Sequence, residues 1–186
     1  EQIGEHDFAL SLADIAAIGT IGDVAPLNGE NRVIVKRAVK RMRDPYYDRP
    51  GIRALMGDMS HITAEDIAYR LAPCLNAAGR LNVKGAELSL ILLFETNPLT
   101  AAELAVKALS INEERKQMQA AAYGQIREEA EKLVNAGDKV LVLCTEKAPN
   151  GIVGLLAGNL KEEFGRPAIV FAFKTDKDGK TVLTGS

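Results

Sequence analysis

One carboxylate, Asp23, lies in a setting that suits a hard divalent cation. It follows an apolar run over residues 12–18 and belongs to the segment Gly19-Thr-Ile-Gly-Asp-Val-Ala-Pro-Leu27. The run predicts a short buried helix or strand, the glycines allow the backbone to pass close to a neighbour, and the proline fixes the exit direction. An acid on a stiff turn after a buried element is a suitable oxygen ligand for a metal. The alternative is that Asp23 caps the helix or turn that follows it.

A second polar constellation follows about fifty residues later, in Arg70-Leu-Ala-Pro-Cys-Leu-Asn-Ala-Ala-Gly-Arg80. Thr63-Ala-Glu-Asp66 predicts a capping box that opens a helix before it, and Pro73 predicts that this helix ends or kinks. Asn76, Gly79 and Arg80 then predict a compact polar turn. A guanidinium there suits a phosphate or a carboxylate; a purely structural turn is the alternative.

Both segments resemble motifs of the DHH-family phosphoesterases, and they are most similar to the RecJ branch of single-strand-specific DNA exonucleases. The first segment, with Glu30-Asn-Arg32 after it, is similar to the fourth conserved motif of the family. The resemblance implies that Asp23 helps to hold a catalytic Mn²⁺ or Mg²⁺ ion. It also implies that Asn76 and Arg80 face the active-site groove and contact the nucleic-acid backbone. Cys74 departs from the family pattern, in which an arginine is expected.

A basic segment lies between the two motifs. Residues 32–53 carry eight Lys and Arg side chains against two Asp, a local charge of +6 in a chain whose net charge is -2. Asn31 predicts the cap of a helix running to about Arg43, and on that helix Arg32, Lys36, Lys40 and Arg43 form one stripe. We expect Arg32, Lys36 and Lys40 to contact phosphates; the alternative is an ordinary solvated helix face.

The second half of the chain predicts one long helix and then a β-α-β unit. Thr100-Ala-Ala-Glu103 predicts a capping box for a helix that continues to about Val134, long enough to cross between domains or to form a coiled coil. Strands are expected over 139–144 and 168–173 with a helix over 152–164 between them, then a hairpin turn over 176–179 and a strand from Thr181.

The loop before the predicted helix 152–164 is a second candidate binding site. Asn150, Gly151 and Gly154 lie where a parallel strand leads into a helix, a place at which sheets bind ligands and helix amides favour anions. Close packing of the glycines is the alternative. The segment resembles the start of the DHHA1 domain, whose loop helps to grip substrate, although an asparagine stands where many relatives carry a histidine.

Composition and cysteine content indicate the cellular compartment of the protein. The chain is 47% hydrophobic and 26% charged, which is typical of a globular protein. No apolar run is long enough for a membrane span, and no signal peptide opens the chain. Cys74 and Cys144 have no metal-ligand spacing. We therefore expect both thiols to be reduced and the protein to be cytoplasmic.

The resemblance implies an α/β chain made of three parts of a longer protein. These are the C-terminal part of a DHH domain (1–98), a long interdomain helix (99–135) and the N-terminal part of a DHHA1 domain (136–186). It further implies a 5′→3′ exonuclease acting on single-stranded DNA in repair and recombination. The Asp-x-Asp, separate Asp and Asp-His-His motifs would precede Glu1, and His6 and His61 match none of them. This segment alone is therefore expected to be inactive.

Two alternative functions remain open. One is a phosphodiesterase acting on short oligonucleotides or cyclic dinucleotides, which Asn76-Ala-Ala-Gly-Arg80 disfavours. The other is a non-catalytic RecJ-like replication scaffold, which the retained Asp23 disfavours. The sequence points to no particular protein partner.

Overall fold

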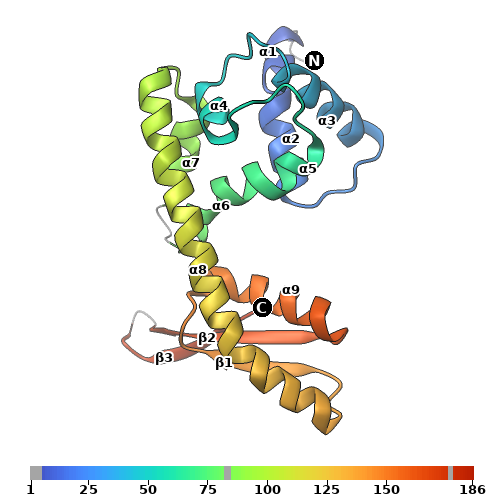
Figure 1. Ribbon diagram of the computed structural model, residues 1–186, viewed down its shortest axis with the longest axis vertical. Coiled ribbons are helices and arrows are strands. Elements are labelled where there is room, and N and C mark those ends of the chain that lie inside the picture. The colour runs from blue at the N-terminus through green and yellow to red at the C-terminus, as the bar shows by residue number, and fades with distance from the viewer. Residues whose placement is uncertain (1–5, 82–84, 176–177) are drawn as a thin grey trace. The chain divides into compact units, whose positions relative to one another are not determined.

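The structure is a computed structural model that describes residues 6–81, 85–175 and 178–186. It divides into two compact units (Figure 1). Unit 1 comprises Glu1–Ala78 and Ala86–Ile111, and unit 2 comprises Gly79–Gly85 and Asn112–Ser186. Helix is the main content of unit 1, whereas the strands belong to unit 2, so the chain is α/β as expected.

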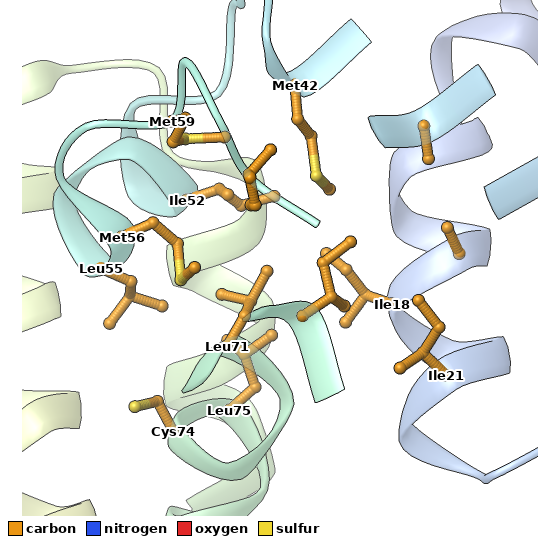
Figure 2. Close-up of a cluster of buried hydrophobic side chains, with 14 of the residues drawn as sticks. Ile18, Ile21, Met42, Ile52, Leu55, Met56, Met59, Leu71, Cys74 and Leu75 are labelled. Atoms are coloured by element: carbon orange, nitrogen blue, oxygen red, sulfur yellow. The ribbon is translucent and has the colours of Figure 1, made fainter. Parts of the chain in front are cut away.

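Unit 1 is built from short helices and the first part of a long one. In chain order these are α1 (His6–Ser11), α2 (Ala13–Gly22), α3 (Gly29–Met42), α4 (Pro50–Met56), α5 (Ala64–Asp66), the π-helix η1 (Ile67–Leu71), α6 (Ala72–Leu81), α7 (Gly85–Phe94) and α8 (Pro98–Ala136). The end of α6, from Gly79 on, belongs to unit 2. Their apolar faces meet in one buried cluster. Figure 2 shows Ile18 and Ile21 of α2 in this cluster with Leu71 and Leu75. These pairs are spaced at three and four residues, as one face of a helix requires.

The capping prediction holds at α5 and fails at α3 and α8. Thr63 and Asp66 form the expected reciprocal capping box. The N-cap of α3 is Asn28 rather than Asn31, whose side-chain Nδ2 instead donates a hydrogen bond of 3.0 Å to the Pro26 carbonyl. At α8, the Asn97 Oδ1 accepts from the backbone N–H groups of Leu99 and Thr100, at 2.9 and 3.4 Å. Asn97 therefore serves the first turn and Thr100 lies inside the helix.

The helical segment does not end at Pro73, because a π-turn precedes the proline. In η1 the Ala72 N–H bonds to the Ile67 carbonyl, five residues back. A proline in an α-helix lacks an N–H and its ring crowds the carbonyl four residues earlier. The wider π-turn shifts the carbonyl pattern before Pro73, and the chain continues into α6. The predicted polar turn at Asn76, Gly79 and Arg80 is therefore wrong: all three residues are helical.

Unit 2 holds the β-α-β unit predicted from the sequence. Strands β1 (Leu141–Thr145) and β2 (Ala168–Thr175) pair in parallel, with α9 (Asn150–Phe164) between them in the chain. Strand β3 (Thr181–Gly185) pairs antiparallel with β2, so the sheet order is β1-β2-β3. The predicted hairpin turn lies partly outside the described residues. Gly165 ends α9 in the left-handed conformation, with φ of 62°.

One face of this sheet is covered by helices. Leu141 and Leu143 of β1 and Val170 and Ala172 of β2 are buried in a cluster with residues of α9 and of the second part of α8. Side chains that alternate with them, Val142, Ile169 and Phe173, are exposed. Helix α8 is unbroken at Gly124 and is followed by Gly137 with φ of 92°, which agrees with the predicted stop.

Candidate metal-binding and nucleic-acid site

Asp23 lies at the C-terminal end of α2, where its carboxylate is exposed. Its backbone N–H donates to the Gly19 carbonyl at 2.9 Å and closes the last turn of the helix. No residue in the described part of the chain donates a hydrogen bond to its side chain. The next helix is capped at Asn28, five residues further on. The structure therefore does not support the alternative that Asp23 caps the helix that follows it. Asp23 is the C-cap residue of α2 through its backbone N–H, and its carboxylate is left available to an external ligand.

The residue after Asp23 adopts a backbone conformation that is unfavourable for its type. Val24 has φ of 55°, the only positive φ of a non-glycine residue in the described ranges, and its side chain is exposed. A β-branched residue in the left-handed region is a genuine outlier. The turn is held by the Ala25 N–H, which bonds to the Thr20 carbonyl, and by Asn31 bonding to the Pro26 carbonyl. Such strain persists where its surroundings fix it, and it clusters at functional sites.

The two sequence motifs meet inside unit 1. A β-carbon on Gly22 would lie 3.6 Å from the Cβ of Ala72 and 4.0 Å from the Nδ2 of Asn76. The exposed Asn76 amide is thus placed next to the end of α2 that carries Asp23. Gly19 and Gly22 both lie within α2. Gly19 has no atom within 4 Å of the position its β-carbon would take.

Two of the three predicted phosphate contacts on α3 line a hollow of about 430 Å³. Lys36, Lys40 and Arg43 line it together with Val35, Val39, Thr63 and Ala64. The Nε of Arg43 donates to the Ile62 carbonyl at 2.9 Å, which fixes the guanidinium at this hollow. Arg32 is exposed on the same helix but does not line the hollow.

Three other arginines of the basic segment, Arg41, Arg49 and Arg53, bond to groups of the fold. Arg49 donates to the buried carboxylate of Asp14 at 2.6 Å, and Tyr47 donates to the same carboxylate at 2.8 Å. Burial raises the pKa of the Tyr47 hydroxyl far above its usual value, and the charge of Asp14 adds to this effect. Arg41 pairs with Asp48, while Arg53 donates to backbone carbonyls. The local charge of +6 therefore overstates the cationic surface.

A second hollow lies beside the Asp23 turn, and sequence reasoning missed it. It measures about 250 Å³ and is mainly apolar, with walls formed by Ile21, Val24, Ala25, Leu27, Ala64, Glu65, Ala68 and Tyr69. Tyr69 is 81% exposed although its neighbours Ile67 and Leu71 are fully buried. The spacing of apolar residues in the sequence could have indicated this, because Tyr69 falls on the helix face opposite the pair Ile67 and Leu71.

In unit 2, the predicted residues Arg80 and Gly151 contact each other. The Nη1 of Arg80 donates to the Gly151 carbonyl at 3.0 Å. A β-carbon on Gly151 would lie 2.1 Å from the Arg80 carbonyl oxygen, so only glycine fits. The close packing considered as an alternative is thus present at Gly151. The hydrogen bond uses one of the five guanidinium N–H groups, and no other described residue accepts from the rest.

The remaining predicted residues of unit 2 differ in environment. The Oδ1 of Asn150, at the first position of α9, is buried and has no hydrogen-bond partner in the described part of the structure. Gly154 is exposed, and a β-carbon there would lie 3.2 Å from the Ser186 Oγ. Gly79 has open space around it. Neither cysteine forms a disulfide among the described residues; Cys74 is buried and Cys144 is exposed.

Within the described ranges, no three or more His, Cys, Asp and Glu side chains gather in a group that could hold a metal ion. None of the described helices is both long and apolar enough to cross a membrane.

Comparisons with known proteins agree on one class, the RecJ single-strand-specific exonucleases. No family model matches the chain. It is 33% identical over 183 residues to the single-stranded-DNA-specific exonuclease RecJ of Dickeya dadantii, covering 94% of this chain and 30% of that protein. For RecJ of Bacillus subtilis the identity is 34%, over 89% of this chain and 21% of the relative.

Solved structures give the same result. RecJ of Thermus thermophilus in complex with Mg²⁺ matches with a TM-score of 0.72 and 32% identity, over 95% of this chain and 27% of that one. An exonuclease RecJ bound to manganese matches with a TM-score of 0.67 and 34% identity, over 88% and 40%. The chain thus spans less than a third of the Dickeya and Bacillus relatives. The resemblance to the RecJ family is confirmed over nearly the whole chain.

Proposed function

We propose that this chain is an internal part of a metal-dependent exodeoxyribonuclease that removes nucleotides from the 5′ end of single-stranded DNA during repair and recombination. The observation that carries the proposal is the meeting of the two motifs: the exposed carboxylate of Asp23 ends α2, and the Asn76 amide lies beside the preceding Gly22. Metal ligands and hydrogen-bond donors placed near each other can together stabilise the charge that develops during phosphodiester hydrolysis.

Asp23 is the residue of this chain that would hold Mn²⁺ or Mg²⁺. Its fit rests on an exposed, unshared carboxylate, which is the oxygen donor that these hard cations prefer. A bound divalent ion supplies charge stabilisation at the phosphoryl group and lowers the pKa of a bound water. The other ligands would come from residues outside this chain, so the isolated segment is expected to release no nucleotides.

The remaining candidate residues would hold the substrate. Lys36 and Lys40 present ammonium groups at a common hollow, and Arg32 extends the cationic face of α3. In unit 2, Arg80 retains donors for a phosphate while Gly151 orients it, and the N–H groups at the start of α9, near Asn150 and Gly154, suit an anion. In domain terms, residues 1–98 would complete a DHH domain, 99–135 a connecting helix and 136–186 the start of a DHHA1 domain.

The substitution Asp23→Asn in the complete protein tests the metal assignment. Since the Asp23 carboxylate caps no helix in this structure, the change is expected to leave the melting temperature without metal close to wild type. Activity with Mn²⁺ or Mg²⁺ on long single-stranded DNA should fall by orders of magnitude, because a charged oxygen ligand is lost. An active Asp23→Asn protein would remove the assignment. Faster hydrolysis of dinucleotides than of long strands would point instead to a short-oligonucleotide phosphodiesterase.

A further inference from the structure

The two hollows of unit 1 adjoin each other and differ in character. Ala64 lines both of them; Thr63 continues the wall of the cationic hollow and Glu65 that of the apolar one. They therefore lie on either side of the start of the α5–η1 segment. The two hollows differ in charge. Lys36, Lys40 and Arg43 bring three positive charges to the first, which Val35 and Val39 also line, whereas the second contains one carboxylate and otherwise apolar or aromatic side chains.

The apolar hollow has walls that are unusually exposed for their residue types. Val24 is 87% exposed, Tyr69 81% and Leu27 41%. Tyr69 offers an aromatic face, and Val24 is presented by the turn whose φ of 55° is unfavourable for valine. Two of its lining residues flank Asp23 in the sequence: Ile21 precedes Asp23 and Val24 follows it. A planar apolar group bound there would lie beside the proposed metal ligand.

A single strand of DNA has the chemistry that matches both hollows. Proteins that bind single strands combine a positively charged groove for the backbone with aromatic side chains on which bases stack. The carboxylate of Glu65 disfavours a phosphate in the apolar hollow, whereas the three cations favour one in its neighbour. Charge and polarity thus assign backbone and base to different sides of Ala64.

We propose that the hollow formed by Val24, Leu27 and Tyr69 binds a nucleobase of single-stranded DNA, with Tyr69 as the stacking residue, while Lys36 and Lys40 hold the adjoining phosphates. The proposal rests on the proposed function, since it takes single-stranded DNA as the ligand. It adds a base-binding site, and a residue, to which the sequence motifs assign no role.

The test compares binding of an oligothymidylate and of an abasic deoxyribose-phosphate strand of equal length to the 186-residue chain, by fluorescence anisotropy. Tyr69→Ala should weaken oligothymidylate binding by about five-fold or more, as loss of one stacked base does, and leave the abasic strand unchanged. Tyr69→Phe keeps the aromatic face and should retain wild-type affinity. The matched control is Tyr46→Ala, because Tyr46 is 93% exposed and lines neither hollow.

A second set of variants tests the cationic hollow. Lys36→Ala with Lys40→Ala should weaken binding of both strands equally and reduce the log–log salt slope by about 0.7 for each phosphate that is no longer neutralised. Arg37→Ala is the matched control, since Arg37 is exposed on the same helix outside the hollow. An equal loss on both strands for Tyr69→Ala, or no loss, overturns the base site alone. Absence of binding to either strand by the wild-type chain overturns the base site together with the DNA-binding part of the proposed function.

A final measurement uses the complete protein, where further polypeptide is present. An oligonucleotide carrying 5-iodouracil should form a photo-crosslink to Tyr69, because the stacked base holds the reactive carbon against the ring. If the rest of the protein covers this hollow instead, Tyr69 will not crosslink and Tyr69→Ala will lower the melting temperature. That result overturns the proposal.

Discussion

The side-chain nitrogen of Asn76 lies 4.0 Å from the position that a β-carbon on Gly22 would occupy. These residues come from motifs about fifty positions apart in the sequence, and α2 and the η1–α6 segment bring them together. Asp23 follows Gly22 directly. A β-carbon at position 22 would be in ordinary van der Waals contact with the amide, whereas a larger side chain would push against it. Position 22 is therefore a sensitive probe of whether the two motifs act together.

Replacing Gly22 by valine should separate the motifs. The valine methyl groups extend beyond the β-carbon position and would displace the Asn76 amide. In the complete protein we expect nuclease activity to fall on the order of 10²-fold, the cost of a misplaced contact of about 1 Å. Gly19→Val is the matched control because the β-carbon position of Gly19 has no atom within 4 Å. Equal activities of the two valine variants would show that Asn76 is not needed beside Asp23.

Gly151→Ala should destabilise unit 2 through a backbone clash. The added β-carbon would meet the Arg80 carbonyl oxygen at 2.1 Å, and a backbone atom cannot move aside as a flexible side chain can. Overpacking of this kind costs about 1–3 kcal/mol. Gly158→Ala, in the same helix and with open space around it, should instead stabilise α9 by up to about 1 kcal/mol. Urea denaturation measures the free energy of unfolding of both variants. A Gly151→Ala protein as stable as wild type would show that the backbone at Arg80 can move away from the added β-carbon.

The buried carboxylate of Asp14 should matter far more to stability than the exposed one of Asp48. Asp14→Ala removes the partner of Arg49 inside the protein, and breaking a buried pair in this way costs about 3–5 kcal/mol. Asp48→Ala removes the partner of Arg41 at the surface, where the Asp48 side chain is 71% exposed. We expect this change to cost about 1 kcal/mol or less. The free energies of unfolding from denaturant titrations test this ranking. Equal values would mean that the Asp14 pair is not isolated from water.

Local patterns in the sequence were sufficient for most elements. The apolar spacing of α3, the capping box at Thr63 and the short apolar runs of β1 and β2 each act within a few residues, so the sequence shows them directly. The prediction failed at α6, where proline and glycine indicated a turn. There, the π-turn at Ile67–Leu71 accommodates Pro73, and packing of Leu71 and Leu75 in the core favours the helix.

The site was predictable only in part, because the sequence shows which side chains are charged but not where each of them points. Arg32, Lys36 and Arg49 are equivalent in composition, yet Arg49 turns inward to Asp14 while the other two face solvent. The partner of Arg49 is 35 residues away in the sequence, beyond any local pattern. Similarly, Tyr69 and Val24 form one hollow only because α2 packs against η1.

The acid stability of unit 2 should depend on Glu163. The hydrogen bond from the Tyr123 hydroxyl, followed by that from Arg127, holds the pKa of the Glu163 carboxyl below its ordinary value of 4.5. Burial and the same hydrogen bond raise the pKa of Tyr123 to about 12. Because the folded-state pKa of Glu163 is lowered, its contribution is fully present above the ordinary value and is lost as pH falls through the lowered one.

Glu163→Gln should therefore unfold at lower urea than wild type at pH 7, by a margin that stays constant down to about pH 5 and shrinks below it as the wild-type carboxyl takes up a proton. Glu162→Gln is the matched control: Glu162 is exposed beside Glu163 in α9 and bonds to no described residue. Its midpoint should follow wild type at every pH. Circular dichroism at a series of pH values measures all three proteins. A margin between Glu163→Gln and wild type that persists unchanged into strong acid would show that the side chain acts through packing, not through its charge.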